Sequence, residues 1–482
     1  MADERGGPGR GPEKAEFVIV SDRLPGPVAD HDPRTGATRL ADDPVTAALS
    51  AACTRRAGHW VGRRPLGRPT LWRGTQVVDL GVDVAGYESH AGSTIWPIYH
   101  DLVRVAGHDR QWRDAFRRAS QAFARAVASR ACPGATVWVH DYHLHLVPSL
   151  LRRARPDLRI GCYLTTPFPS PDLLRQTPMS AELASGLCGA DLVGFQSAQS
   201  AENFLRLRAD LVASPADVDG HASEVQVGVY PTSVDSHRVE ALARRPAVLR
   251  RAAEIRASLG DPAVVLLSID SPTAAAGIQH RLQGLGAMLG GGLLDPDRVA
   301  IVQVVTGGAD NPSDIAARAA GEAARINGQF ASVGRPCVHF VRQVPMLEEL
   351  VALYQAADVL LATPLREGAT TAALEFAAVA VPDSAIVLSE FSGTAAVLPE
   401  AFPVNPYDED RFRVALLAAI ASGPDDRRRR MDAMHAYVMS YDTHAWARLF
   451  LSGLRRPDDA SVVRSGLHWP ANAVRSTAAR DV

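Results

Sequence analysis

Lysine is almost absent from this chain of 482 residues. Lys14 is the only lysine, and the other 50 of the 51 basic residues are arginine. GC-rich codon usage accounts for such a bias without any functional cause. The folded part of the chain therefore has no lysine ammonium group to offer a ligand or a reaction.

Cysteine is scarce and long apolar runs are missing. The five cysteines are scattered without CxxC spacing, so neither a disulfide framework nor a zinc site is expected. No run of eighteen apolar residues predicts a membrane span, and the segment MADERGGPGRGPEKAE lacks the apolar region of a signal peptide. The formal net charge of -2 gives no strong field for nucleic acid. We expect a cytoplasmic protein that binds no nucleic acid or membrane and uses no metal or cofactor.

The chain is too long for one hydrophobic core, so two domains are expected. Apolar runs that alternate with helical periodicity predict two successive α/β units with doubly wound parallel sheets. Helices are expected at 45–53, 111–127 and 238–259, and strands at 17–20, 135–139, 159–164, 225–230, 263–269, 299–305, 338–341, 359–361 and 385–388. The predicted organisation is a disordered leader (1–14), an N-terminal domain (15–236), a C-terminal domain (237–455) whose last helix is a candidate for packing back on the first domain, and a loose tail (456–482).

Three spaced motifs follow the expected strand at 135–139: VWVHDYHLHLVPSLL from Val137, PFPSPDLL from Pro167 and ADLVGFQS from Ala190. Since open α/β sheets bind ligands beyond the carboxyl ends of their strands, Asp141 is expected at the mouth of a crevice. Together these motifs resemble the trehalose-6-phosphate synthases, the retaining glycosyltransferases of family 20. The resemblance implies the GT-B architecture, in which two Rossmann-like domains face each other across a cleft.

The resemblance also implies a site for the acceptor, glucose 6-phosphate. In the family an arginine after the first strand grips the phosphate, and here the VSDR segment supplies Arg23, with an aspartate where an asparagine is usual. Tyr87 and Trp96 match the aromatic residues that shape the acceptor pocket. Asp141 matches the catalytic-site aspartate that accepts hydrogen bonds from sugar hydroxyls. The segment AARINGQF matches a family motif and assigns Arg325 as a second phosphate ligand from the other domain.

The motifs for the nucleotide-sugar donor are altered. Two carboxylates replace a glycine pair that approaches the diphosphate, and the arginine and lysine after the first strand of the second domain are both lost. These substituted positions are Asp42, Asp43, Ser271 and Ala276. Cations at a leaving diphosphate stabilise its developing charge, and removing one such group typically costs about 3 kcal/mol of transition-state stabilisation.

Three further donor-site motifs match the family at their flanking residues but carry substitutions within them. In TPLREGATTAALEF, Glu367 stands for an aspartate and Thr370 for an asparagine, while Gly368 and Glu375 remain as donor-site remnants. Thr165 replaces a histidine beside the donor sugar. Arg63 replaces a tryptophan that lines the pocket.

Three functions stay open at this point. The first is transfer of glucose from a nucleotide-glucose to glucose 6-phosphate in trehalose biosynthesis. The second is a catalytically degenerate pseudoenzyme that binds sugar phosphate and regulates or scaffolds an active synthase, as a homo-oligomer or in association with it. The third is a tailoring transferase with an altered donor, for which no positive residues are found.

Overall fold

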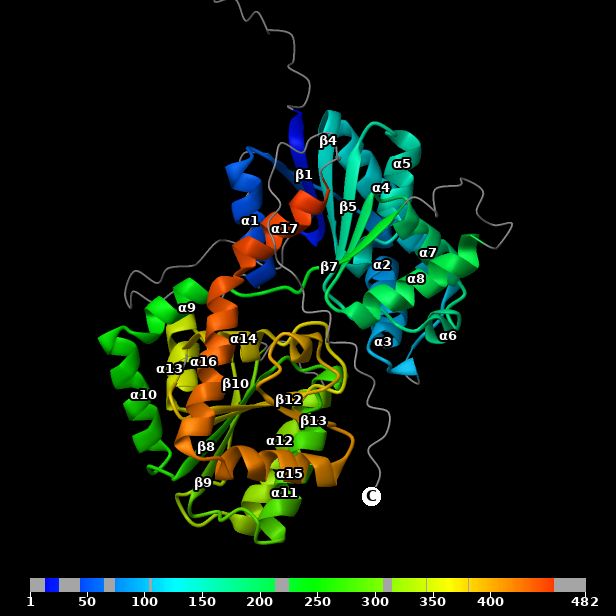
Figure 1. Ribbon diagram of the computed structural model, residues 1–482. Helices are drawn as coiled ribbons and strands as arrows, with labels where there is room; N and C mark the ends of the chain where they lie inside the picture. Colours follow the sequence, from blue (N-terminus) through cyan, green and yellow to red (C-terminus); the bar gives the residue numbers. More distant parts are fainter. Residues whose placement is uncertain are drawn as a thin grey trace, which may run out of the picture.

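The computed structural model describes residues 14–25, 44–64, 74–103, 106–212, 225–306, 314–343, 345–379 and 381–454. Asp42, Asp43 and the expected tail at 456–482 lie outside these ranges. Within them the chain forms two α/β units that lie one above the other in Figure 1. No helix in these ranges has the length and apolar character needed to cross a membrane.

The first unit is built on a seven-stranded parallel sheet with the order β3-β2-β1-β4-β5-β6-β7. Its strands are β1 (Ala15–Arg23), β2 (His59–Arg63), β3 (Thr75–Val77), β4 (Ala131–His140), β5 (Arg159–Leu164), β6 (Leu192–Phe195) and β7 (Gln226–Val229). Its helices are α1 (Pro44–Arg55), α2 (Val84–Ser89), α3 (Trp96–Tyr99), α4 (Arg110–Arg130), α5 (Val147–Ala154), α6 (Pro171–Leu174), α7 (Ser180–Cys188) and α8 (Ala198–Val212). Chain order reverses between β1 and β4, which makes the carboxyl ends of these two strands the topological switch point.

The second unit repeats this plan with a six-stranded parallel sheet of order β10-β9-β8-β11-β12-β13. Its strands are β8 (Val264–Asp270), β9 (Val299–Val305), β10 (Val338–Arg342), β11 (Val359–Ala362), β12 (Ala385–Ser389) and β13 (Phe402–Val404). Its helices are α9 (Ser236–Ala243), α10 (Pro246–Ser258), α11 (Ile278–Gly290), α12 (Asp314–Phe330), α13 (Leu347–Ala356), α14 (Thr371–Val379), α15 (Glu409–Ala421) and α16 (Pro424–Ser440). Here the switch point lies between β8 and β11. Two doubly wound parallel sheets confirm the expected α/β, GT-B fold class.

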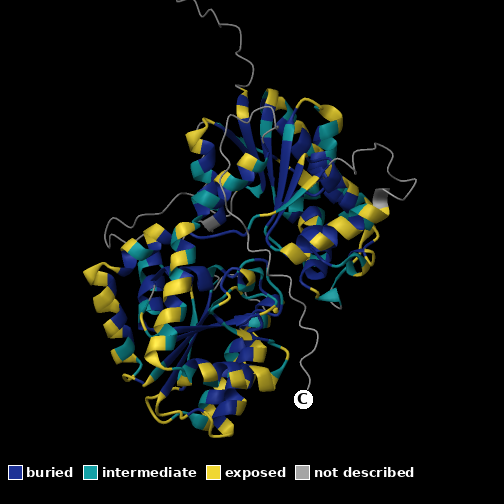
Figure 2. Ribbon diagram, viewed as in Figure 1, coloured by how far each residue is buried: buried dark blue, intermediate teal, exposed yellow. Residues whose placement is uncertain are grey.

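Both sheets are buried on their two faces. The central strands are apolar along almost their whole length, as parallel strands covered by helices must be. Figure 2 shows these strands in dark blue between helices whose outer faces are yellow or teal. The strand ends, where polar residues begin, are therefore the positions open to a ligand.

The expectation of one helix at 238–259 is wrong. The structure has α9 and α10 instead, and α10 begins at Pro246. Proline cannot donate a hydrogen bond within a helix and disfavours helical backbone in the residue before it, so Arg245 is extended.

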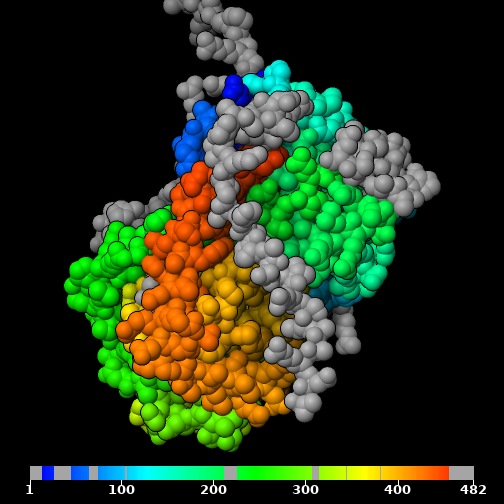
Figure 3. Space-filling model, in the orientation of Figure 1, coloured from blue at the N-terminus to red at the C-terminus, as the bar shows by residue number. Residues whose placement is uncertain are grey.

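The last described helix, α17 (Thr443–Gly453), leaves the second unit and packs on the first sheet. Trp446 is fully buried there, with its ring centroid 5.4 Å from that of Trp138 and 5.0 Å from that of Tyr163. Figure 3 shows the orange and red surface of α16 and α17 continuing from one unit onto the other. The two units thus share part of a hydrophobic core.

Candidate active site

The switch point of the first sheet brings polar residues from β1 and β4 to one edge. The two strands pair in parallel, with Val20 opposite Val139, so their carboxyl ends lie together. Asp22 and Arg23 end β1, and Asp141 follows β4 directly. The structure therefore places Arg23 and Asp141 where the topology predicts a ligand site.

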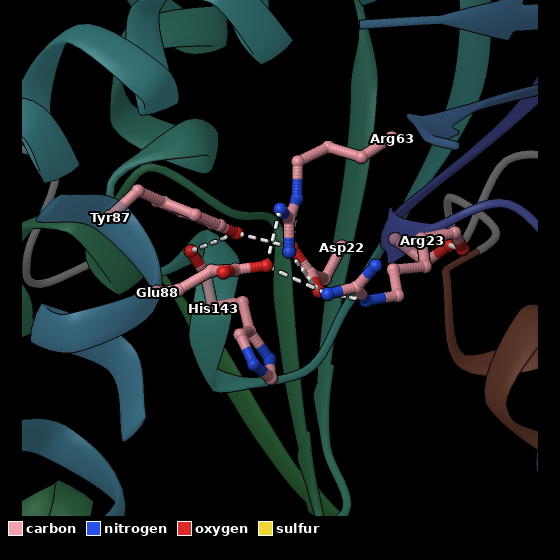
Figure 4. Close-up of polar contacts among 7 residues, drawn as sticks. Asp22, Arg23, Arg63, Tyr87, Glu88 and His143 are labelled. Carbon is pink, nitrogen blue, oxygen red and sulfur yellow. Dashed lines mark hydrogen bonds and ion pairs between the residues drawn. The ribbon is translucent and has the colours of Figure 1, made fainter. Parts of the chain in front are cut away.

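A buried ion pair forms the floor of this edge. The Arg63 guanidinium holds Asp22 with two parallel hydrogen bonds, from Nε to Oδ1 and from Nη2 to Oδ2, both 2.9 Å long. The Tyr87 hydroxyl donates to the same Asp22 Oδ1 at 2.8 Å, and the Arg63 guanidinium carbon lies 5.0 Å from the centre of the Tyr87 ring. Figure 4 shows the three side chains converging from β1, β2 and α2. This fork-to-fork geometry is the strongest that arginine and carboxylate make.

A second carboxylate closes the cluster from the outside. Glu88 Oε1 accepts a hydrogen bond from Arg23 Nη2 at 2.7 Å and another from Arg63 Nη1 at 2.8 Å. One oxygen atom therefore lies between two guanidinium groups. Arg23 and Tyr87, both assigned to the acceptor phosphate, are each engaged by a carboxylate of this chain.

Burial and charge have opposite effects on Asp22. Burial acts to raise the pKa of Asp22, but the nearby His143 and the contacts with Arg63 and Tyr87 outweigh it, so this pKa lies below its usual value. Burial together with the Asp22 carboxylate raises the pKa of Tyr87 well above its usual value. Tyr87 therefore keeps its proton and donates it in the hydrogen bond to Asp22.

Asp141 is held in a strained backbone conformation. Its φ of 69° lies in the region that side-chain-bearing residues rarely adopt, and such strain concentrates at functional sites. The Asp141 carboxylate accepts hydrogen bonds from the hydroxyls of Thr165 at 3.1 Å and Thr166 at 3.2 Å, and from the Tyr142 amide at 2.9 Å. Its backbone amide donates to the Tyr163 carbonyl at 2.8 Å. Thr165 thus helps to orient the Asp141 carboxylate.

Trp96 begins α3 and stacks on His100, with ring centroids 4.1 Å apart. Burial lowers the pKa of His100 to about 4, so this imidazole is neutral near pH 7. A π-helical turn, His90–Ile95, separates Tyr87 from Trp96. Such widened turns are frequent at functional sites.

The structure does not bring Arg325 to this cluster. Helix α12 starts at the carboxyl edge of the second sheet, and Arg325 lies roughly 16 Å along its axis from the first residue at 1.5 Å per residue. Its guanidinium is bound by Glu322 and Gln329 of the same helix. The assignment of Arg325 to the acceptor site therefore stays a prediction from the motif match, and the contacts of its side chain in the structure lie within α12.

The donor side of the cleft carries no cation at the two altered positions. Ser271 directly follows β8 and is exposed, while Ala276 is buried in a short helical turn, Ala274–Ala276. Arg281 does not replace them, because it is buried and donates to Asp270, Thr363 and Gln303. In the described ranges no three His, Cys, Asp or Glu side chains are grouped to hold a metal ion.

The loop before α14 closes on the first unit. A Cβ atom on Gly368 would lie 1.8 Å from the Thr165 carbonyl oxygen, so only glycine fits this approach. Arg366 on the same loop pairs across the cleft with Asp101 at 3.4 Å. The loop with Gly368, which the resemblance assigns to the donor, therefore packs directly against Thr165 of the first unit.

Polar residues of this loop bind one another. Thr370 donates from its hydroxyl to Glu367 at 2.6 Å, and the Thr370 amide donates to the Thr394 hydroxyl at 2.8 Å. Glu375 is buried and accepts a hydrogen bond from Tyr354 on α13 at 2.7 Å. Glu375 thus contributes to the core packing of the second unit.

The profile of glycosyltransferase family 20 matches residues 79–456. The chain belongs to glycosyltransferase family 20.

Its relatives in this family are trehalose-6-phosphate synthases. The enzyme of Mycolicibacterium vanbaalenii is 37% identical over 481 residues, covering 93% of this chain and 98% of that one. That of Mycolicibacterium smegmatis is 37% identical over 466 residues, with 91% and 92% covered.

Solved structures of the family show the same fold. The trehalose 6-phosphate synthase of Burkholderia multivorans superposes with a TM-score of 0.80 at 28% identity, covering 92% of this chain and 98% of that one. The UDP-forming synthase of Burkholderia xenovorans, solved in complex with glucose-6-phosphate, gives 0.79 at 25% identity, with 91% and 99% covered. The chain is thus a trehalose-6-phosphate-synthase-like glycosyltransferase in fold and family.

The sequence did not single out Glu88 or the pairing of Asp22 with Arg63. Both Asp22 and Arg63 stand at positions where the family usually has another residue, an asparagine and a tryptophan respectively. Two charge changes of opposite sign are a signal for an ion pair, but they lie far apart in sequence, and only the β1–β2 pairing brings them together.

Proposed function

We propose that this family member binds a hexose 6-phosphate on its first unit and transfers glucose slowly or not at all. One contrast carries the proposal: Ser271 and Ala276 place no cation beside the donor loop, whereas Arg23, Tyr87 and Asp141 lie at the switch-point edge of the first sheet. A sugar phosphate needs a guanidinium for its phosphate and a carboxylate for its hydroxyls. Both are present at that edge.

The chemistry of the donor half supports a low rate. When a nucleoside diphosphate departs, negative charge develops on it, and the surrounding groups must stabilise this charge. Arg281 is bound to Asp270, and Glu367 adds a carboxylic acid to the loop before α14. Without two cations, loss of about 3 kcal/mol for each one predicts a rate several orders of magnitude below that of an intact synthase.

The regulatory role proposed here is that of a sugar-phosphate sensor that acts on an active synthase. Its alternative, a working transferase, is favoured by the full-length similarity to trehalose-6-phosphate synthases. The sensor and the working transferase differ in whether the protein binds a nucleotide-glucose.

Calorimetry with each ligand alone separates these functions. Glucose 6-phosphate is expected to release heat on binding, and UDP-glucose and GDP-glucose are expected to give none up to millimolar concentration. Arg23→Ala should remove most of the response to glucose 6-phosphate. Saturable donor binding together with trehalose 6-phosphate formation at an ordinary rate would establish the working transferase instead.

A further inference from the structure

Glu88 has the position of an anion bound between two arginines. Its Oε1 atom is 2.7 Å from Arg23 Nη2 and 2.8 Å from Arg63 Nη1. A phosphate oxygen makes the same contacts with guanidinium groups, at the same distances. Figure 4 shows the Glu88 carboxylate joined by dashed lines to both arginines.

Exposure divides the cluster into a fixed inner pair and a movable outer pair. The side chains of Arg63 and Asp22 are 8% and 15% exposed, whereas those of Arg23 and Glu88 are 33% and 43% exposed. The inner pair is held by two parallel hydrogen bonds and by Tyr87. Glu88 is held only through one oxygen and is free on its solvent side to rotate away.

Charge balance predicts what Glu88 does in the free protein. Two arginines face two carboxylates, so the four groups sum to zero while Glu88 is in place. When Glu88 swings out, Arg23 Nη2 and Arg63 Nη1 lose this partner, and Arg23 keeps only the longer 3.6 Å ion pair of its Nε with Asp22. The site then gains a positive charge. A doubly charged phosphate interacts more strongly with that site than a singly charged carboxylate does.

We propose that Arg63 is a second phosphate-binding residue and that Glu88 takes the place of the phosphate until a sugar phosphate displaces it. This rests on the proposed function of the first unit as a sugar-phosphate site. Arg63 stands where the family has a tryptophan, and Asp22, where it has an asparagine, fixes the orientation of Arg63. Asp22 and Arg63 thus make the site select phosphorylated over unphosphorylated hexose. Glu88 sets the concentration of sugar phosphate that is needed to displace it.

The test measures binding of glucose 6-phosphate and of glucose by calorimetry. Glu88→Gln removes the competing charge at an exposed position and is expected to tighten glucose 6-phosphate binding two- to fivefold, the range of an exposed ion pair. Glucose binding should stay unchanged. Glu349→Gln is the matched control, since Glu349 pairs with Arg251 by two 2.8 Å hydrogen bonds in the second unit.

Arg63 is tested together with its partner so that no buried charge is left alone. Asp22→Asn combined with Arg63→Gln should weaken glucose 6-phosphate binding about tenfold or more, as expected for loss of one charge-assisted contact. Adding Glu88→Gln to this double variant should then increase the affinity for glucose 6-phosphate by less than Glu88→Gln does in the wild type. The effects are not additive because Glu88 and Arg63 act on the same phosphate.

The outcomes separate the two proposals. If the wild type binds glucose 6-phosphate and Glu88→Gln and the Asp22 and Arg63 double variant both bind it equally well, the role of Glu88 and Arg63 is refuted and the sugar-phosphate site stands. If the wild type gives no heat and Glu88→Gln does, Glu88 is the barrier proposed here. If neither binds, the sugar-phosphate site itself is refuted.

Discussion

Glu367 is a carboxylic acid whose ionisation opposes folding. Burial raises the pKa of Glu367 to about 7, the nearby Asp270 adds to the rise, and the hydrogen bond from Thr370 works against it. In the unfolded chain a glutamate titrates at about 4.3. Between these two values the folded protein binds the proton more tightly than the unfolded chain does, so this group lowers the free energy of unfolding as the pH rises from about 4 to 7.

We predict that Glu367→Gln stabilises the protein above pH 7. Glutamine keeps the acceptor for the Thr370 hydroxyl and has no proton to lose, so the gain should grow from near zero at pH 4 to about 1 to 3 kcal/mol at pH 8. Chemical denaturation of both proteins across this range measures it. A gain that does not change with pH would contradict the assignment.

Arg325 and Arg23 make a matched pair of arginines for binding experiments. Both are partly exposed and each binds a glutamate, Glu322 and Glu88 respectively. Only Arg23 lies at the switch point, so we predict that Arg325→Ala leaves glucose 6-phosphate affinity within about twofold while Arg23→Ala lowers it at least tenfold. Equal losses of glucose 6-phosphate affinity in the two variants, measured by titration calorimetry, would support Arg325 as a residue of the acceptor site.

For single residues, the sequence could predict which side chains lie near the site but not which side chains bind one another. Motif spacing predicted Asp141 and Arg23 after their strands, and the structure has them there. It could not predict that Asp22 and Arg63 bind each other, because this depends on the register of β1 and β2. For Arg325 the motif match gave a residue, but not its place on α12 or its contacts there with Glu322 and Gln329.

Among the elements, most strands of four or more residues were predictable, and the three-residue strands β3 and β13 were not. The apolar runs at 159–164 and 299–305 coincide with β5 and β9. The strands β3 (TQV) and β13 (FPV) are too short to form an apolar run that stands out in the sequence. Pro246 marks this break in the sequence, but the regular spacing of alanine and arginine on both sides of the proline favoured the prediction of one continuous helix.

Helix α17 packs on the first sheet through several apolar side chains, of which Trp446 is the largest. Trp446 is buried between Trp138 and Tyr163. We predict that Trp446→Ala lowers the free energy of unfolding by about 3 to 5 kcal/mol through loss of buried surface and the cavity it leaves. Because the helix comes from the second half of the chain, the calorimetric unfolding peak should also broaden or split. Trp446→Phe is the milder control, and a single sharp peak in Trp446→Ala would contradict this coupling.

For the whole molecule, the closed cleft depends on a glycine. The Gly368 contact with Thr165 involves a backbone oxygen, which cannot move aside as a flexible side chain could. We predict that Gly368→Ala separates the two units and raises the radius of gyration measured by small-angle X-ray scattering. Gly321→Ala is the control, since an added Cβ there meets no atom within 4 Å. Identical scattering from the two variants would show that the loop yields instead.

The return of α17 also sets the order in which this protein can be made. Trp138 and Tyr163 belong to strands synthesised early, yet the side chains that cover them, Trp446 and Phe450, emerge from the ribosome near the end of translation. A nascent first unit therefore displays an uncovered aromatic surface while the second unit is being synthesised. Exposed apolar surface of this kind recruits chaperones and promotes aggregation. The yield of folded protein in a cell should accordingly depend on how quickly translation reaches α17.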